Sequence, residues 1–181
     1  MRISKTIICY LLLLALSRSC QAQVKGDHDV SKSLRNFVQN FYDSYTPLVL
    51  KSHGKPPWEG VLKSKRSEFS TELVRALRED FAAQAKDPGE IVGLDFDPFL
   101  NSQDPGEHYE VGKITQKGDS YFVEVSGVWS GKKSEKPDVV VQLVNQDGHW
   151  LFVNFYDGGK YPNGGDLLTI LKTLRDERQK K

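Results

Sequence analysis

The stretch from Tyr109 to Tyr156 constrains the fold most, because it consists of strand-like runs separated by turn residues. Within it, Ser120–Trp129 alternates a mainly apolar set of side chains with a more polar set, which is typical of a half-buried antiparallel strand. Asp147-Gly148 separates the runs Val139–Val144 and His149–Tyr156, and Asp-Gly in that position favours a tight hairpin turn. We therefore expect an antiparallel sheet of four to five strands.

Helical patterns flank these strands on both sides. Apolar residues recur at three- and four-residue spacing from Leu34 to Val49, which predicts a helix that Pro47 bends or ends. A second helix is expected from near Ser70 to Pro88-Gly89, and a third is expected to begin after a cap at Asp166. We expect a loop over Lys51–Lys65 and a short strand over Ile91–Leu94. The order helix, helix, strands, helix predicts an α+β domain.

Residues 1–22 have the pattern of a cleavable secretory signal. Two basic residues precede the ten mainly apolar residues 7–16, a run too short to cross a bilayer, which needs about 20 helical residues. The favoured cleavage follows Ala22, and a lipoprotein anchored at Cys20 or an uncleaved anchor are the alternatives. The remaining residues 23–181 form one expected domain, with an ordered core over 30–178 and a polar, mobile lead-in over 23–30.

Processing would change the composition in ways that exclude several classes of protein. Removal of the signal takes away both cysteines and three basic residues, leaving 22 basic against 24 acidic residues. A chain so close to neutrality is a poor nucleic-acid binder, and a chain without cysteine has neither disulfides nor thiol chemistry. We expect an exported protein, periplasmic or secreted, without a transmembrane segment in the mature chain.

Three segments carry a resemblance to a known family: Phe37–Tyr45, Leu94–Asp104 and Tyr161–Leu168. Together they resemble domain-of-unknown-function family 3828, an uncharacterised bacterial envelope family that is similar to the NTF2-like superfamily. The resemblance implies a strongly curved sheet that closes with its helices into a cone, and it implies no activity, cofactor or catalytic residue. Ser44 departs from the family pattern, in which an aromatic residue is common at this position, so a pocket here would be wider or altered.

An acidic segment before the strands offers the only cation candidates, namely Asp95, Asp97, Asn101 and Asp104. Counted from Asp95, the calcium-loop pattern fails at its fifth, sixth and twelfth positions. The favoured interpretation is that these side chains hold local turns while neighbouring aromatic residues pin the segment to the core. We expect no metal and no cofactor.

Aromatic side chains supply the remaining site candidates, because Tyr and Trp combine an apolar body with a polar tip. Five residues are expected to line the mouth of the curved sheet: Tyr42, Tyr45, Trp129, His149 and Trp150. Alternation alone leaves open which strand face lines that mouth. The first interpretation is non-enzymatic binding of a partner protein or small ligand, and the alternative is an enzyme that uses a Tyr/Asp/His group in the same pocket.

Overall fold

The computed structural model describes the backbone of residues 5–52, 57–87 and 89–180, and side chains from residue 28 onward. The chain forms two compact units, residues 1–36 and residues 37–181. The first unit is the N-terminal part of helix α1 (Lys5–Lys51), whose last fifteen residues belong to the second unit. The predicted cleavage after Ala22 and the lipid anchor at Cys20 concern side chains outside this description. Within the described residues, no helix combines the length and apolar character needed to span a bilayer.

Helix α1 differs from the prediction at both ends. The polar lead-in over 23–30 is helical and continuous with the rest of α1, so the helix begins well before the expected apolar stripe. Pro47 also does not end the helix, which continues to Lys51. Proline removes one backbone donor, and so close to the C-terminus the loss is a single hydrogen bond, while Ser52 still closes the last turn onto the Val49 carbonyl at 3.0 Å.

The predicted loop over Lys51–Lys65 contains a short helix, α2 (Trp58–Ser64), which the 3₁₀ turn η1 (Arg66–Glu68) follows. Trp58, Val61 and Leu62 are buried, so α2 presents apolar residues at three- and four-residue spacing to the core. Its preceding prolines and Gly60 hid this pattern in the sequence.

Helix α3 (Thr71–Lys86) begins as predicted, with Ser70 accepting a hydrogen bond from the Leu73 amide. The predicted strand over Ile91–Leu94 is wrong, because side chains of α3 take its backbone donors. Gln84 accepts from the Val92 and Gly93 amides at 3.0 Å. Gly93 lies so close to α3 that a Cβ there would be 2.7 Å from an Asp80 oxygen, so this segment is held against the helix and not in the sheet.

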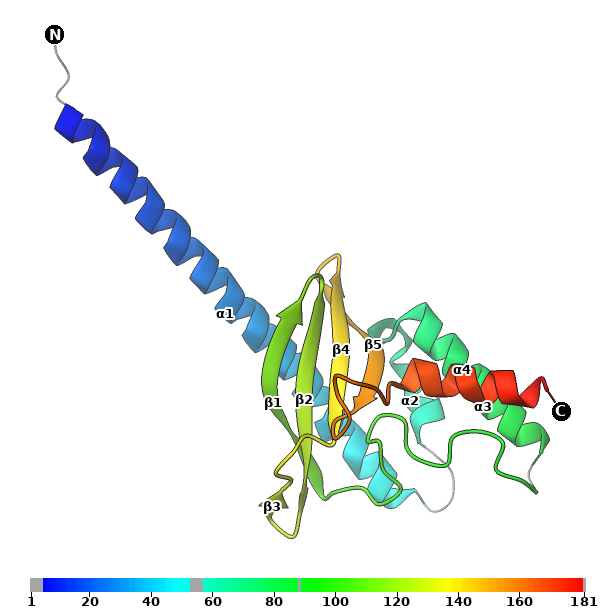
Figure 1. Cartoon of the computed structure of the whole chain (residues 1–181). Coiled ribbons are helices and arrows are strands. Elements are labelled where there is room, and N and C mark those ends of the chain that lie inside the picture. Colours follow the sequence, from blue (N-terminus) through cyan, green and yellow to red (C-terminus); the bar gives the residue numbers. More distant parts are fainter. Residues whose placement is uncertain (1–4, 53–56, 88, 181) are drawn as a thin grey trace. The chain divides into compact units, whose positions relative to one another are not determined.

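The sheet is antiparallel, with strand order β1-β2-β4-β5 (Figure 1). Its strands are β1 (His108–Lys117), β2 (Ser120–Trp129), β3 (Lys132–Lys133), β4 (Val139–Gln146) and β5 (His149–Asp157). The short strand β3 pairs only with β2. Asp147 and Gly148 adopt φ values of 53° and 84°, the left-handed conformation of a two-residue hairpin turn. The predicted α+β class and the antiparallel sheet are confirmed.

One face of the sheet packs against the C-terminal part of α1. Val123, Val141 and Phe155 lie in register across β2, β4 and β5 on this face, and all three are buried. Aromatic rings fill the space above them: Phe41, Phe69, Phe99 and Phe152 lie with centroids 4.8–5.8 Å apart. The helix-facing side of the sheet is therefore occupied by side chains of the core.

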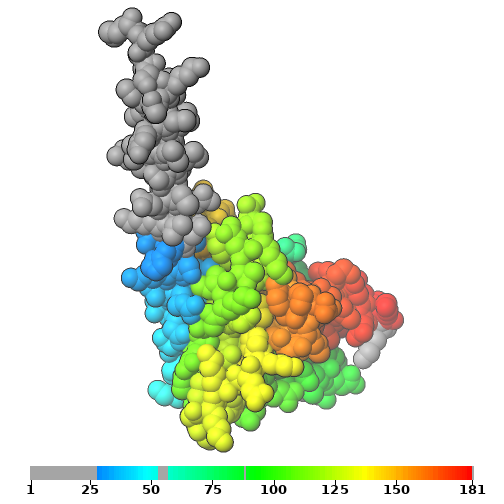
Figure 2. Space-filling view, turned by 60° about the vertical axis from the view of Figure 1, so that its left-hand side comes forward, coloured from blue at the N-terminus to red at the C-terminus, as the bar shows by residue number. Residues whose placement is uncertain are grey.

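Helix α4 (Leu167–Arg178) begins with Asp166 as its predicted cap, which accepts from the Thr169 amide at 3.0 Å. Asn154 of β5 fastens this end to the sheet by donating to Asp166 and accepting from the Leu168 amide. In Figure 2 the orange atoms border the green and yellow strands, and the red atoms of α4 lie on the far side of the orange ones. The same arrangement places α4 alongside α3 (Figure 1).

Candidate ligand-binding cleft

The two tyrosines predicted for the site lie in the core of the second unit. Tyr42 and Tyr45 are each 1% exposed. The Tyr42 hydroxyl donates to the Phe99 carbonyl at 2.9 Å, and the Tyr45 hydroxyl donates to an Asp97 carboxylate oxygen at 2.5 Å. Burial raises the pKa of both phenols well above the usual range. Both side chains are therefore neutral donors whose hydroxyl groups are already bonded.

The other three predicted site residues do not form a common pocket with these tyrosines. Trp129 packs edge-on against Tyr109, with centroids 6.3 Å apart, and Trp150 is buried against Tyr121 at 5.1 Å. His149 is exposed beside the β4–β5 turn. Four cavities among the described residues have none of these five residues in their lining.

A cleft of about 600 Å³ lies instead between the end of α1, α2, α3 and the segment 94–105. Trp58 and Phe81 form one aromatic wall, edge to face with centroids 5.4 Å apart, and Phe96 contributes a third ring. The described residues of its lining are Val49, Ser52, Pro57, Trp58, Asp80, Phe81, Gln84, Leu94, Asp95, Phe96, Asp97, Ser102, Gln103 and Pro105. We call this space the Trp58 cleft.

The turn that begins at Asp97 builds the acidic side of the Trp58 cleft. One Asp97 carboxylate oxygen accepts from the Phe99 and Leu100 amides at 3.0 and 3.1 Å. The backbone amide of Asn101 donates to the Asp97 backbone carbonyl at 2.8 Å. Phe99 and Leu100 are fully buried and anchor the turn in the core. The predicted role of this segment, polar side chains holding a turn pinned by aromatic and apolar residues, matches this geometry.

The electrostatics of the Trp58 cleft centre on the Asp97 carboxyl group. Burial raises its pKa to about 6, although hydrogen bonds from Tyr45 and from the Phe99 and Leu100 amides act in the opposite direction. Asp95 is exposed at the rim and accepts from Gln103 at 3.3 Å. No Lys, Arg or His is among the residues that line the cleft, as far as the chain is described.

The four cation candidates of the sequence do not converge. Asp95 and Asp97 make the separate contacts given above, Asp104 is exposed with its amide bonded to Ser102, and Asn101 occupies a left-handed turn position with φ of 51°. Within the described residues, no group of three or more His, Cys, Asp or Glu side chains is placed to hold a metal ion.

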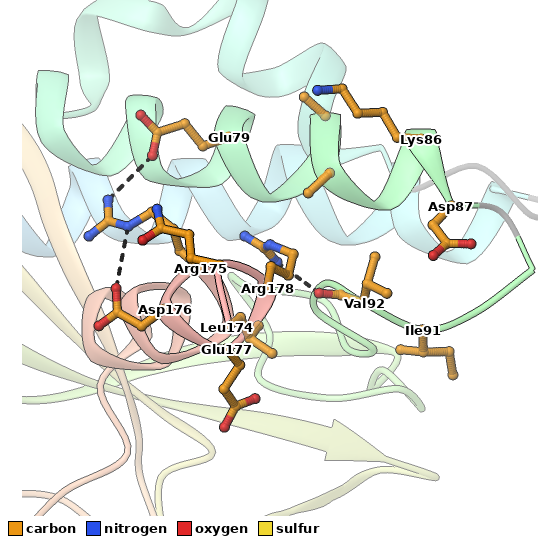
Figure 3. Close-up of a pocket in the computed structure, with 13 residues that line it drawn as sticks. Glu79, Lys86, Asp87, Ile91, Val92, Leu174, Arg175, Asp176, Glu177 and Arg178 are labelled. Carbon is orange, nitrogen blue, oxygen red and sulfur yellow. Dashed lines mark hydrogen bonds and ion pairs between the residues drawn. The ribbon is translucent and has the colours of Figure 1, made fainter. Parts of the chain in front are cut away.

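A second, larger groove of about 1170 Å³ lies between α3 and α4. Figure 3 shows Arg175 lying between Glu79 of α3 and Asp176 of its own helix, at 3.4 and 3.8 Å. Arg178 donates to the Val92 carbonyl and to Asp80, at 2.7 and 2.6 Å. We call this space the α3–α4 groove. Its two arginines are bonded within the molecule.

Sequence reasoning missed the aromatic walls of the Trp58 cleft. Trp58 belongs to the segment that was expected to be a loop, Phe81 to the second expected helix, and Phe96 to the aromatic residues expected to pin the acidic segment to the core. The sequence did point to Asp95 and Asp97 of this lining, but as candidate ligands of a cation. The sequence does show aromatic residues beside proline and acidic residues, at Pro57-Trp58 and again in the segment 94–105. Only the tertiary structure brings these two stretches together.

Comparison with known proteins adds little to this geometry. No model of a protein family matches the chain, and no protein of curated function matches it. Among solved structures, the chain is similar to one in the type VI native effector-immunity complex Tae3-Tai3 from Ralstonia pickettii, with 26% sequence identity and a TM-score of 0.44. The match covers 67% of this chain and 92% of that chain. A TM-score below 0.5 does not establish a shared fold.

Proposed function

We propose that this chain is a non-enzymatic binding protein whose ligand occupies the Trp58 cleft. The observation that carries the proposal is a cavity of about 600 Å³ with aromatic walls and one partly buried carboxylate. Ligand sites in proteins are clefts of roughly 300–1,000 Å³, mainly apolar, with a few convergent polar groups. The Trp58 cleft has this size and this composition.

The proposed place of binding differs from the mouth of the sheet that the sequence suggested. In the second unit, the rings of Phe41, Phe99 and Phe152 occupy the helix-facing side of the sheet. A ligand there would have to displace buried core residues, and each large-to-small change in such a core costs several kcal/mol, about 2–5. Binding in the Trp58 cleft requires no such displacement.

The cellular setting and the family remain part of this proposal. We retain an exported protein of the bacterial envelope, similar to family 3828 and to the cone-shaped NTF2-like superfamily, on the sequence patterns alone. N-terminal sequencing of the exported protein tests the first part and is expected to begin at Gln23. A lipid-modified Cys20 at the N-terminus would replace this proposal with a lipoprotein.

The binding proposal is tested by filling the cleft from α1. Val49 lines the cleft and is half-buried, so Val49→Trp is expected to occupy it; Leu50, 49% exposed and outside the lining, provides the matched control Leu50→Trp. The indole N–H signals of the three tryptophans are followed by NMR against a fragment panel of cationic, neutral and anionic compounds, with Trp58→Phe to assign the signal.

Fragments are expected to shift the Trp58 signal in the wild type and in Leu50→Trp, and not in Val49→Trp. A panel that leaves the Trp58 signal unmoved, or that moves it equally in Val49→Trp, would contradict binding in the cleft.

A second candidate function is an enzyme in which Asp97 transfers a proton. The pKa of about 6 favours it, because a carboxyl group that titrates near neutrality can act as an acid or a base. Against it, three donors already bond this carboxyl group, and no histidine is among the described residues that line the cleft; His53 lies outside the description. Conversion of a cleft ligand to a product by the wild type but not by Asp97→Asn, followed by mass spectrometry, would establish this candidate.

A further inference from the structure

We propose that the ligand of the Trp58 cleft carries a primary ammonium group on an apolar chain, with the ammonium at Asp97 and the chain between the aromatic walls. This inference rests on the proposed function, because it names the chemistry of the ligand that the cleft takes.

The charges of the lining select a cation. Three carboxylates line the cleft, from Asp80, Asp95 and Asp97. Asp80 is neutralised internally by Arg178 at 2.6 Å, whereas Asp95 accepts from the Gln103 side-chain amide, and Asp97 accepts from the Tyr45 phenol and two backbone amides. With no cationic side chain in the described lining, a ligand cation would supply the missing positive charge.

The aromatic walls favour an organic cation over a hydrated one. Trp58, Phe81 and Phe96 present three rings to a cleft that is wide enough for a short alkyl chain. A cation near an aromatic face is attracted by the negative potential of the ring, and the attraction is strongest for Trp. The same chain uses this contact on the other side of its sheet, where the Lys117 ammonium lies 5.2 and 5.0 Å from the ring centroids of Phe122 and Tyr161.

The hydrogen bonds of Asp97 favour an ammonium over a metal ion. A carboxylate offers about four acceptor sites, and three donors use three of them: the Tyr45 hydroxyl and the Phe99 and Leu100 amides. One site remains, which suits one N–H donor. A hard cation such as calcium takes six to eight oxygen ligands, several of them carboxylates, and the described residues bring no three His, Cys, Asp or Glu side chains together to hold one.

The test compares three probes of one length and three charges: n-hexylammonium, 1-hexanol and hexanoate. Binding is measured by NMR from the Trp58 indole signal, in the wild type, in Asp97→Asn and in Glu79→Gln. Glu79 belongs to the α3–α4 groove, so Glu79→Gln removes one carboxylate charge from the molecule without touching the Trp58 cleft. Thermal melts confirm that each variant is folded.

We expect n-hexylammonium to bind at least about tenfold more tightly than the other two probes, a difference of about 1.4 kcal/mol. Asp97→Asn is expected to remove this preference while Glu79→Gln keeps it. Phe96→Leu, which keeps apolar volume and removes one ring, is expected to weaken the ammonium about two- to fivefold. Binding of 1-hexanol or hexanoate to the cleft as tightly as the ammonium would overturn the inference and leave cleft binding intact; no binding by any probe or by the fragment panel would overturn both.

The ammonium could belong to a free amine or to a lysine side chain. Nα-acetyl-lysine methylamide, which carries the lysine ammonium flanked by peptide bonds, separates these sources when it is titrated beside n-hexylammonium. Tighter binding of the lysine derivative indicates a peptide source, and tighter binding of n-hexylammonium indicates a free amine. Failure of both to bind more tightly than 1-hexanol would contradict the inference.

Discussion

Among the cavities that border helix α3, the α3–α4 groove and the Trp58 cleft differ in how their charges are balanced. Glu79, Ala83 and Lys86 line the α3–α4 groove, whereas Asp80, Phe81 and Gln84 line the Trp58 cleft on another face of the same helix. In the groove, Arg175 and Arg178 of α4 form ion pairs with Glu79 and Asp80 of α3, respectively. In the cleft, Asp95 and Asp97 accept hydrogen bonds from uncharged donors and pair with no cation of the described residues.

This difference shows that the larger of these two cavities is not for that reason the better candidate for a binding site. The larger space is bridged by ion pairs that fasten α4 to α3, while the smaller one combines rings with uncompensated carboxylates. The groove therefore serves the fold, and the cleft is the better candidate for a ligand. Each of the following changes either breaks or sharpens this contrast.

Arg178→Ala is expected to have the largest effect on stability, because it leaves the buried carboxylate of Asp80 without its cation. Loss of one partner of a buried pair costs about 3–5 kcal/mol, and the Asp80 side chain is only 4% exposed. Urea denaturation measures the change. A loss below about 1 kcal/mol would show that this end of the groove is not held by its ion pair.

Asp97→Asn is expected to raise the free energy of unfolding at pH 7 by about 1–3 kcal/mol. The pKa of Asp97 is raised from 3.8 to about 6 in the folded chain, so between these values the folded state binds more protons than the unfolded state. The stability contributed by this group therefore falls as pH rises through that window. The stability of Asp97→Asn is expected not to fall in this pH window. Its side-chain amide oxygen can still accept from the backbone amides of Phe99 and Leu100.

Urea denaturation of the wild type and Asp97→Asn from pH 3.5 to 7.5 measures the difference. A variant less stable than the wild type across the whole range would show that the ionised carboxylate supports the fold. The Asp97 carboxylate would then serve stability, as the ion pairs of the α3–α4 groove do. The expectation that the cleft keeps this carboxylate at a cost in stability would be wrong.

Tyr45→Phe is expected to lower stability by about 0.5–1.5 kcal/mol, because it removes the hydrogen bond to Asp97 with little change in packing. It is also expected to raise the pKa of Asp97 further, since the Tyr45 hydroxyl favours the ionised carboxylate. A carboxyl-detected NMR titration follows that pKa. Tyr42→Phe, which loses a bond to a backbone carbonyl, is the control and is expected to leave the pKa of Asp97 nearly unchanged.

Arg175→Ala is expected to have the smallest effect, within about 0–1 kcal/mol, because Arg175 and Glu79 are 41% and 45% exposed and water screens their interaction. Urea denaturation at low and high salt measures it beside Arg178→Ala. A loss as large as that of Arg178→Ala would show that the exposed part of the groove is as tightly held as its buried end.

Helices α3 and α4 and the strands could be predicted because their determinants are local. Ser70 and Asp166 cap the helices, Asp147-Gly148 makes the turn, and alternation marks Ser120–Trp129. Helix α2 could not be predicted in the same way, since its propensity is interrupted by Gly60 and its stability comes from burial of Trp58. The strand expected over Ile91–Leu94 did not form, because Gln84 and Asp80 of the preceding helix α3 accept hydrogen bonds from its backbone amides.

The site was harder to predict than the fold. Tyr45 and Asp97 were both candidates, but as a pocket residue and a cation ligand, and nothing in the sequence indicates that one donates to the other. Trp129, His149 and Trp150 share strands with core residues, and alternation could not tell a packed position from an exposed one. The Trp58 cleft is assembled from four segments, so its lining follows only from the tertiary structure.

The most direct test of the account is where a bound probe lies. Intermolecular NOEs from n-hexylammonium to the protein report which side chains it contacts, and the two cavities carry different reporters. The account predicts NOEs to the rings of Trp58 and Phe96 in the cleft. NOEs to Leu174 and to Ile91, which is 77% exposed at the α3–α4 groove, without any to Trp58, would contradict it.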